Sequence, residues 1–186
     1  MKRTFIAVNV PVEKTLGNLL DSMKNDLQGE RIKWEDLSRL HITLAFIGET
    51  SEGTIKDIEK LLSVICEKTS SIEISVKGLG LFKSLHDPRV IWAGIEDNNS
   101  LSVLQARIIS GLDSLGVMTE DRPFRPHLTL GRIRSVKRKD ILEKILVTGA
   151  NTQFQRNKLT ELVYYESVLR QEGSLYIPIK RLILGG

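Results

Sequence analysis

Two seven-residue segments of this chain are nearly identical: His41-Ile42-Thr43-Leu44-Ala45-Phe46-Ile47 and His127-Leu128-Thr129-Leu130-Gly131-Arg132-Ile133. Four of the seven positions match, and a fifth exchanges isoleucine for leucine. The two histidines lie 86 residues apart (127 − 41), close to half of the 186-residue chain. Because two of the chain's three histidines begin these segments, the repeat indicates two related half-units that share one site.

Apolar and polar residues alternate in each segment, as they do in a β-strand. Successive side chains of a strand point to opposite faces, so His41 and Thr43 share one face while Ile42 and Leu44 pack behind it. Imidazole exchanges a proton near neutral pH, and a hydroxyl donates a hydrogen bond to an oxyanion. A single histidine on a strand is most often structural. Two facing copies of the pair predict instead a clamp for a tetrahedral phosphate.

The composition is that of an ordinary globular protein. Hydrophobic residues make up 41% of the chain and charged residues 27%. The net charge of +4 and the isoelectric point of about 9.2 are compatible with a phosphate-bearing partner. Cys66 is the single cysteine, so no intrachain disulfide forms and a reducing compartment is expected, with Cys66 as a small core residue.

Several classes of protein are not supported by the sequence. No stretch approaches the ~20 apolar residues of a membrane span, and the first apolar run ends at Asn9 and Pro11, too soon for a signal peptide. Three scattered histidines and one cysteine do not form a zinc set, and Gly78-x-Gly80 lacks the Lys-Ser/Thr of a triphosphate-binding loop. We therefore expect a cytoplasmic protein with no metal, no cofactor and no membrane partner.

The periodicity of apolar residues predicts the order of the elements. Helical spacing predicts helices at residues 13–28, 53–68, 100–115 and 137–147. Besides the two motif strands, we expect strands at residues 4–10, 72–76, 90–95, 159–169 and 175–184, and a short extended piece at 32–34. Each half of the chain then supplies helices, a motif strand and further strands. The expected fold is α+β, a single domain (1–186) made of two pseudo-symmetric lobes, with mainly antiparallel sheets lining a central cleft and helices outside.

The paired motifs resemble those of the two-histidine (2H) phosphoesterase superfamily, whose signature is two His-hydrophobic-Thr/Ser-hydrophobic segments. Within it the chain looks most like the RNA 2′,3′-cyclic phosphodiesterases, historically called 2′-5′ RNA ligases. The matching positions run through nearly the whole chain: Arg3-Thr4-Phe5-Ile6-Ala7, Trp34, Gly48, Pro88-Arg89-Val90-Ile91-Trp92, Phe124-Arg125-Pro126, Ser167-x-Leu169, Gly173 and Tyr176.

This resemblance implies metal-independent opening of a 2′,3′-cyclic phosphate at an RNA end, giving a 2′-phosphomonoester. It implies His41 as general acid and His127 as general base, although the near symmetry of the motifs leaves their order open from sequence alone. Thr43 and Thr129 would bind the non-bridging oxygens of the phosphate. The two histidines then need opposite protonation states, which predicts a bell-shaped pH profile.

Phe46 and Arg132 occupy equivalent positions, five residues after each histidine. The resemblance implies that the aromatic ring stacks on a base and that the arginine approaches the phosphate. Strict alternation would place both on the opposite face, so we expect a bulge near Ala45 and Gly131. The alternatives are a core phenylalanine and a solvated arginine.

The expected partners are RNA ends bearing a 2′,3′-cyclic phosphate, with tRNA-derived ends as one candidate source, and the expected state is a monomer. The alternatives are reversible 2′-5′ RNA ligation, hydrolysis of a small cyclic nucleotide, and a non-catalytic module that binds RNA ends. The third histidine, His86, adjoins Asp87-Pro88 and is expected in a surface loop. Trp34, Trp92 and Tyr176 are candidates for core or cleft positions, with a core position expected for Trp92.

Overall fold

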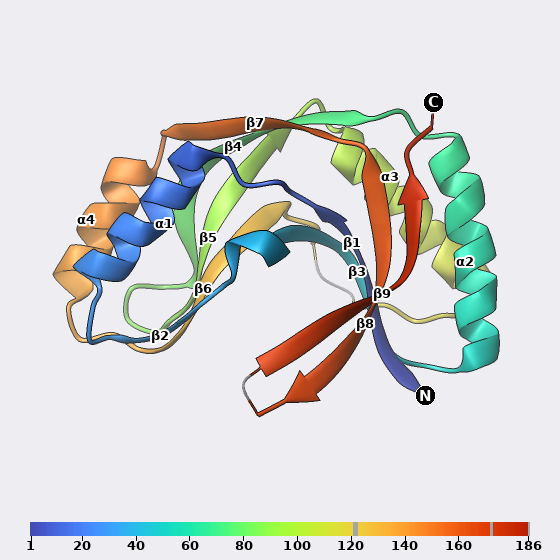
Figure 1. Ribbon diagram of the computed structural model, residues 1–186, viewed down its shortest axis with the longest axis horizontal. Coiled ribbons are helices and arrows are strands. Elements are labelled where there is room, and N and C mark those ends of the chain that lie inside the picture. The colour runs from blue at the N-terminus through green and yellow to red at the C-terminus, as the bar shows by residue number, and fades with distance from the viewer. Residues whose placement is uncertain (121–122, 172, 186) are drawn as a thin grey trace.

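The computed structural model of the protein describes residues 1–120, 123–171 and 173–185 (Figure 1). Its helices are α1 (Lys14–Asp26), α2 (Glu52–Glu67), α3 (Ser100–Ser114) and α4 (Lys139–Gly149), with a 3₁₀ turn η1 (Leu37–Arg39). Its strands are β1 (Lys2–Asn9), β2 (Arg31–Trp34), β3 (His41–Thr50), β4 (Ile72–Lys83), β5 (Pro88–Asp97), β6 (His127–Ser135), β7 (Gln153–Leu159), β8 (Glu161–Arg170) and β9 (Gly173–Ile183). All four predicted helices are confirmed, and their ends differ from prediction by two residues or fewer.

Helix α2 shows how the sequence builds these elements. Ser51 caps its first turn, where the hydroxyl accepts a hydrogen bond from the Thr54 N–H at 3.2 Å. Its buried face carries Ile55, Ile58, Leu62 and Cys66 at helical spacing. Burial raises the pKa of the Cys66 thiol to about 11, so this cysteine is a core residue, as predicted. None of the helices in the described ranges is both long and apolar enough to cross a membrane.

The strands form two antiparallel sheets, which confirms the predicted α+β class. The four-stranded sheet has the order β3-β1-β8-β9, and the five-stranded sheet has the order β2-β6-β5-β4-β7. The two orders correspond. In the smaller sheet the motif strand β3 pairs with β1, and in the larger sheet the motif strand β6 pairs with β5. Strand β2 is the extra member and lies on the outer side of β6, whereas β3 forms an edge.

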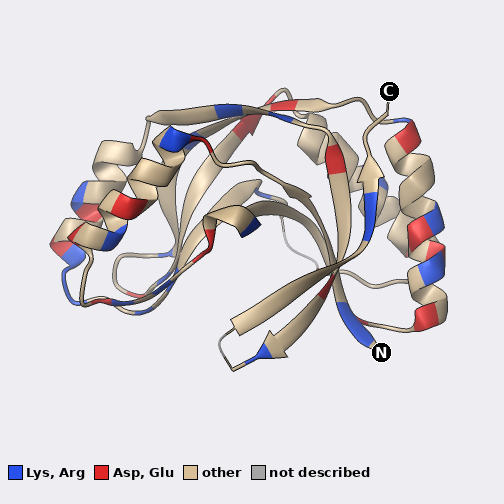
Figure 2. Ribbon diagram, in the orientation of Figure 1, with Lys and Arg blue, Asp and Glu red and all other residues tan. Residues whose placement is uncertain are grey.

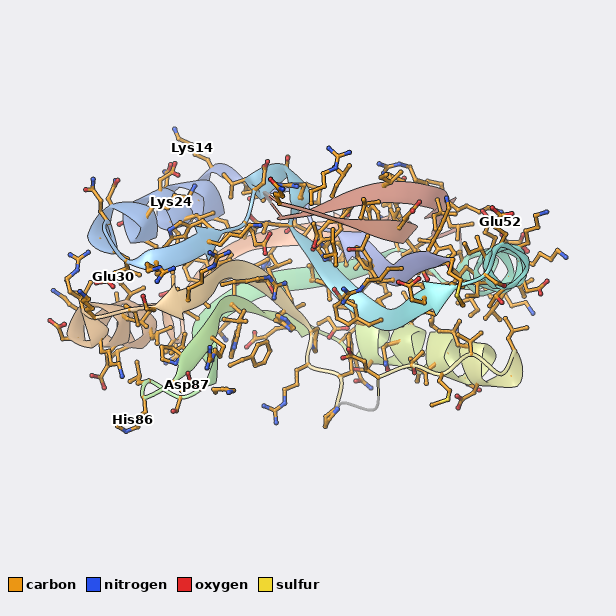
Figure 3. The ribbon with its side chains drawn as sticks, turned by 90° about the horizontal axis from the view of Figure 1, so that it is seen from below. Lys14, Lys24, Glu30, Glu52, His86 and Asp87 are labelled. Atoms are coloured by element: carbon orange, nitrogen blue, oxygen red, sulfur yellow. The ribbon has the colours of Figure 1, made fainter. Side chains whose placement is uncertain are left out.

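Two of the four described helices pack against the sheet that does not contain the strand preceding them in the sequence. Helix α1 follows β1 of the smaller sheet but packs on β7 of the larger one, and α3 follows β5 of the larger sheet but contacts β3 and α2. Helices α2 and α4 pack on strands of their own sheets, β9 and β4. As a result α1 and α4 lie at one end of the molecule and α2 and α3 at the other (Figures 1 and 3).

The lobes are therefore not the two halves of the sequence, and the expected half-units are wrong in this respect. The smaller sheet takes β1 and β3 from the first part of the chain and β8 and β9 from its end, while the middle of the chain builds most of the larger sheet. One continuous cluster of buried residues contains side chains from both sheets, such as Ile6 and Ile42 of the smaller and Ile91 and Leu128 of the larger.

Two strand predictions needed correction. Strand β7 was not expected because its sequence is mostly polar; it is an edge strand that pairs with β4 alone and buries little more than Phe154, Gln155 and Leu159. Strand β4 continues past the predicted end at Val76 to Lys83. A register shift absorbs Gly78, whose φ of +79° suits glycine, and the strand continues beyond it.

Candidate active site

Strand β3 carries a bulge that changes the face on which its later side chains lie. Two adjacent residues of β1 lie opposite Thr43 and Ala45, so Leu44 is the extra residue of the pair. Leu44 and Ala45 are therefore both buried, and Phe46 returns to the face of His41, where 47% of its surface is exposed. The bulge predicted for this strand is confirmed.

Strand β6 repeats the same irregularity. Two adjacent residues of β5 lie opposite Thr129 and Gly131, so Leu130 is the extra residue. Leu130 is buried, the Gly131 backbone is buried with it, and Arg132 emerges on the face of His127. Each motif strand therefore presents its histidine, its threonine and the sixth residue of its motif, Phe46 or Arg132, on one face.

The ring of each histidine is held in one tautomer by the backbone. His41 Nδ1 lies 2.8 Å from the Arg39 carbonyl oxygen, and His127 Nδ1 lies 2.7 Å from the Arg125 carbonyl oxygen. A carbonyl oxygen only accepts hydrogen bonds, so Nδ1 carries the proton and donates it in both rings. In each neutral imidazole Nε2 is then the free acceptor, available for proton transfer.

An aromatic ring meets each imidazole edge-on. The Tyr176 ring of β9 lies 5.3 Å from the His41 ring, at an interplanar angle of 86°. The Phe82 ring of β4 lies 4.7 Å from the His127 ring, at 85°. With one ring nitrogen bonded to a carbonyl and one edge packed against an aromatic ring, each imidazole has a defined orientation.

The two histidines and Arg132 form one electrostatic site, although they come from different sheets. Burial lowers the pKa of His41; the Arg39 carbonyl and the Glu35 carboxylate oppose this, and the charges of Arg132 and His127 lower the pKa further. Burial also lowers the pKa of His127, against the effect of its backbone hydrogen bond, and Arg132 adds to the lowering. Both imidazoles are therefore biased toward the neutral form when no ligand is bound.

The two motif threonines are available to a ligand. Thr43 and Thr129 are half-buried beside their histidines. Neither hydroxyl forms a hydrogen bond with any residue in the described part of the chain, whereas the buried hydroxyls of Thr4 and Thr50 bond to one another at 2.7 Å. Two free hydroxyl donors beside two imidazoles suit the binding of an oxyanion.

Arg132 is held over the site by an acidic residue that the sequence did not indicate. Its Nε donates to Glu35 Oε1 at 3.1 Å, and Glu35 follows β2, the outer neighbour of β6. Glu35 lies outside both motifs, so no sequence signal marked it. The carbonyls of Arg39 and Arg125 did have a signal, because each arginine stands two residues before its histidine.

Trp92 does not lie in the main core, contrary to expectation. It pairs with Thr129 across the strands and so shares the face of the site. The indole packs directly against the Gly80 backbone, where an added Cβ would come within 2.1 Å of the ring. The centroids of the Trp92 and Phe82 rings are 5.8 Å apart. Phe82 therefore contacts both His127 and Trp92. On the other sheet Phe5 and Tyr176 contact His41, and Tyr165 stacks on Phe5.

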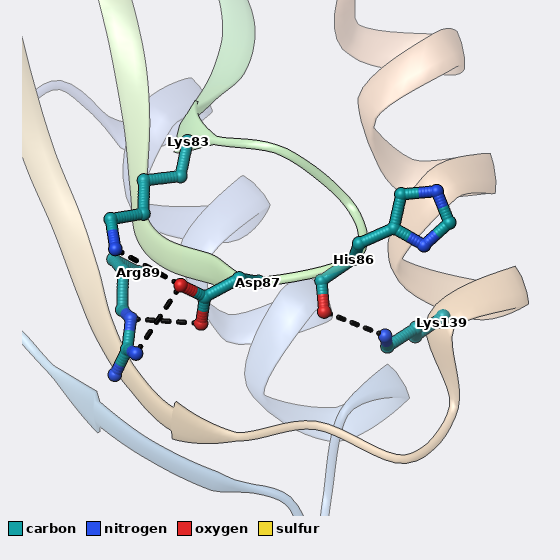
Figure 4. Close-up of polar contacts among 5 residues, drawn as sticks. All are labelled: Lys83, His86, Asp87, Arg89 and Lys139. Atoms are coloured by element: carbon teal, nitrogen blue, oxygen red, sulfur yellow. Dashed lines mark hydrogen bonds and ion pairs between the residues drawn. The ribbon is translucent and has the colours of Figure 1, made fainter.

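His86 lies apart from the site, in the turn between β4 and β5, and is exposed as predicted (Figure 3). Its carbonyl oxygen accepts a hydrogen bond from Lys139 Nζ at 3.0 Å, and its ring points away from the turn (Figure 4). The neighbouring Asp87 pairs with Lys83 at 3.0 Å and with Arg89 at 2.9 Å. These contacts stabilise the turn.

The described residues contain no group of three His, Cys, Asp or Glu side chains placed to hold a metal ion.

Of the sequence-predicted site residues, His41, Thr43 and Phe46 lie together on one sheet. His127, Thr129 and Arg132 lie together on the other. The contacts between β3 and β6 bring the two sets to one place in the molecule.

Comparison with known proteins agrees with this geometry. The LigT like Phosphoesterase family model matches residues 6–92 and 94–176, which include both motif strands. The RNA 2′,3′-cyclic phosphodiesterase of Methanothermobacter thermautotrophicus is 27% identical over 176 residues, 94% of each chain. The protein of that name from Archaeoglobus fulgidus is 31% identical over 175 residues, 94% of this chain and 96% of its own.

The fold also matches a solved structure. TT0787 of Thermus thermophilus superposes with a TM-score of 0.81 at 22% sequence identity, covering 99% of this chain and 98% of that chain. At this identity the likeness concerns the fold. The family model and the relatives extend over most of the sequence, and on that basis this chain belongs to the LigT-like phosphoesterase family.

Proposed function

We propose that this protein hydrolyses 2′,3′-cyclic phosphates at RNA ends to 2′-phosphomonoesters, with its two histidines as a general acid–base pair. The observation that carries the proposal is the duplicated arrangement of an imidazole with a free Nε2 beside an unpaired hydroxyl. Relatives of similar length that bear the name RNA 2′,3′-cyclic phosphodiesterase support this substrate class. The chemistry is assigned to side chains alone, without a metal ion.

One nearby charge distinguishes the two histidines and supports an order for them, although burial lowers the pKa of both. The general acid must hold a proton when the substrate arrives, and Glu35 raises the pKa of His41. Among the described residues, no carboxylate contributes to the pKa of His127. A nearby carboxylate favours the protonated imidazole. This difference supports His41 as the acid and His127 as the base.

In the proposed step His127 Nε2 takes a proton from water as the water oxygen attacks phosphorus. The bond between phosphorus and the ribose 3′ oxygen breaks, and His41 donates its proton to that oxygen. The phosphate stays on the 2′ oxygen, which gives a 2′-phosphomonoester and a 3′-hydroxyl. General acid and general base catalysis each contribute about 10²–10⁴-fold to the rate.

The remaining motif residues bind the substrate. The hydroxyls of Thr43 and Thr129 donate to the two non-bridging oxygens, whose negative charge grows in the transition state. Arg132, held by Glu35, lies close enough to both histidines to place its positive charge near the phosphate. Phe46 offers an exposed ring above Phe5, with ring centroids 6.1 Å apart, on which a base can stack.

The test is hydrolysis of a short RNA that ends in a 2′,3′-cyclic phosphate, with EDTA present, by the wild type, His41→Ala and His127→Ala. The expected result is metal-free turnover by the wild type, a 2′-phosphate product and a large loss in both variants. His86→Ala is the matched control, because His86 is exposed in a distant turn, and it is expected to retain full activity.

Two outcomes would contradict the proposal. Turnover that EDTA abolishes would replace the two-histidine mechanism with a metal-assisted one. No turnover by well-folded wild type, together with binding that survives both histidine substitutions, would favour a module that binds RNA ends without cleaving them.

A further inference from the structure

A pocket of about 350 Å³ adjoins the candidate active site. One wall is the segment from β2 to η1, a second is Arg132 of β6, and the third is the hairpin of β8 and β9. Tyr176 lines the pocket and also meets the His41 ring edge-on, so the pocket begins one aromatic ring away from the imidazole. The pocket and the catalytic face therefore share Tyr176 and Arg132.

Four of the eleven described residues that line this pocket are basic. Lys33, Arg39, Arg132 and Arg170 are cationic, and Glu35 is the one acidic residue among them. Glu35 is paired with Arg132, and Arg39 lies 3.7 Å from Asp36 outside the pocket lining, so Arg170 is the cation of the lining that we consider for a ligand. Figure 2 shows basic positions along β2, in η1 and at the end of β8, the three segments that meet here.

The pocket also offers flat and apolar surfaces. Trp34 and Tyr176 supply aromatic rings, and Leu169 is 68% exposed beside them. Aromatic rings next to positive charges are the combination that binds single-stranded nucleic acid, because bases stack and phosphates pair. The volume is near the lower end of the range for small-molecule sites, about 300–1,000 Å³, which suits one nucleotide.

We propose that this pocket is a subsite for the nucleotide that precedes the cyclic phosphate, in which Arg170 holds the phosphodiester on the 5′ side of the terminal nucleoside. The inference rests on the proposed function, because that function places the cyclic phosphate between the two histidines. An RNA end then continues only in its 5′ direction, and the basic pocket is the adjoining space.

Arg170 is the residue on which the subsite can be tested most cleanly. It is exposed at the end of β8, opposite Gly173 in the hairpin, and forms no ion pair with any other described residue. Its charge is therefore available to a ligand, and its removal breaks no ion pair among those residues. The other cations are less suitable, since Arg132 lies over the histidines and the Arg39 backbone orients His41.

The experiment compares two substrates: a nucleoside 2′,3′-cyclic phosphate with a free 5′-hydroxyl, and a dinucleotide that ends in the same cyclic phosphate. The wild type is expected to show a higher kcat/KM for the dinucleotide. Arg170→Ala is expected to lower that value about tenfold, through loss of one charge-assisted contact, and to leave the mononucleotide value unchanged. Arg170→Lys is expected to recover part of the loss.

The matched control is Arg156→Ala, which removes an exposed arginine from β7, at the opposite edge of the five-stranded sheet from β2. It is expected to cleave both substrates like the wild type. The dependence of dinucleotide binding on salt gives a second readout, because loss of a phosphate contact lowers the slope of log K against log salt by about one. Arg170→Ala is expected to show that change.

The other outcomes overturn the subsite, and they distinguish its failure from a failure of the proposed function. Equal kcat/KM values of the wild type for both substrates would remove the subsite while supporting cyclic phosphate hydrolysis. An equal loss on both substrates in Arg170→Ala would place Arg170 at the reaction centre instead. If neither substrate is cleaved, the proposed function fails, and titration with a dinucleotide 2′-phosphate decides the subsite: equal affinity of the wild type and Arg170→Ala overturns it.

Discussion

Strands β3 and β6 present the same pair of groups from two sheets, but their surroundings differ. Each has a bulge at the leucine after its threonine, a histidine ring bonded to a backbone carbonyl and an aromatic ring edge-on to that histidine. Strand β3 is an edge, whereas β6 is covered on its outer side by β2. This difference explains why equivalent positions of the two motifs hold alanine and glycine. Beside the edge strand β3 there is room for the Ala45 side chain, whereas a Cβ on Gly131 would come within 2.9 Å of the Trp34 ring of β2.

The outer neighbour of β6 also changes the charges in the site. It brings Glu35 to Arg132, and Glu35 in turn raises the pKa of His41 across the site. The shared features of the two strands therefore place the groups that we propose to react. The features that differ, namely Phe46 against Arg132 and the presence of Glu35, give the two histidines different environments and different proposed tasks.

The largest expected effect tests whether the two histidines do different chemistry. His41→Ala and His127→Ala are each expected to slow cleavage of a normal cyclic phosphate about 10²–10⁴-fold. When sulfur replaces the 3′ oxygen, the leaving group departs as a thiolate that needs little protonation. His41→Ala is then expected to recover most of its rate, while His127→Ala stays slow because water still needs a base. Single-turnover rates on both substrates measure the difference.

The wild type and His86→Ala serve as references on both substrates. Recovery by His127→Ala alone would reverse the assigned order of acid and base. Recovery by both variants, or by neither, would contradict a division of labour between the two strands.

The next effect tests what the strands share. Thr43→Val and Thr129→Val are each expected to lower kcat about 10²-fold, since each removes one donor to a charge that develops in the transition state. The melting temperature is expected to change little, because neither hydroxyl is paired within the described structure. Thr43→Ser and Thr129→Ser keep the hydroxyl and are the controls. A loss confined to one threonine would show that the strands are not equivalent in chemistry.

Much of this comparison could be predicted from the sequence, because it depends on local patterns. The 3.6-residue period predicted the four helices, and the strand period placed each histidine with its threonine. The bulges were predicted from a requirement: Phe46 and Arg132 reach the site only if the alternation breaks. Leu44 and Leu130 are the residues that break it.

Features that depend on distant contacts could not be predicted in this way. The exchange of α1 and α3 between the sheets follows from how the two repeats pack, which no local period records. Glu35 reaches Arg132 only because β2 pairs with β6, 97 positions further along the chain. Trp92 has the large apolar side chain that is typical of a core residue. Gly80 lies opposite it on β4 and leaves room for the indole on the face of the site.

Phe46→Ala tests one feature in which the strands differ, and a smaller effect is expected. A base that stacks on an exposed aromatic ring gains roughly 1–3 kcal/mol, so KM is expected to rise about tenfold with little change in kcat. Phe46→Trp keeps a stacking surface and is expected to bind like the wild type. The melting temperature is the second measurement: a large decrease with unchanged KM would make Phe46 a packing residue.

The smallest expected effect is on pH dependence, and it tests the charges that distinguish the strands. Burial first, and Arg132 in addition, lower the pKa of both histidines below the ordinary value of 6.5. The reactive form holds one proton on the pair, so kcat/KM is expected to follow a bell with its maximum on the acid side of 6.5. A maximum on the alkaline side would contradict this assignment of the buried imidazoles.

Arg132→Gln and Glu35→Gln are expected to move that maximum in opposite directions. Arg132→Gln removes a positive charge that lowers both pKa values, so the maximum moves to higher pH. Glu35→Gln removes a negative charge that raises the pKa of His41, so the maximum moves to lower pH. Both substitutions break the same 3.1 Å ion pair, and loss of that contact alone would affect the two profiles alike. Opposite shifts therefore require the charges themselves to act on the histidines. The Glu35 shift would also link the proposed role of His41 as acid to β2, the strand that pairs with β6 and has no counterpart beside β3.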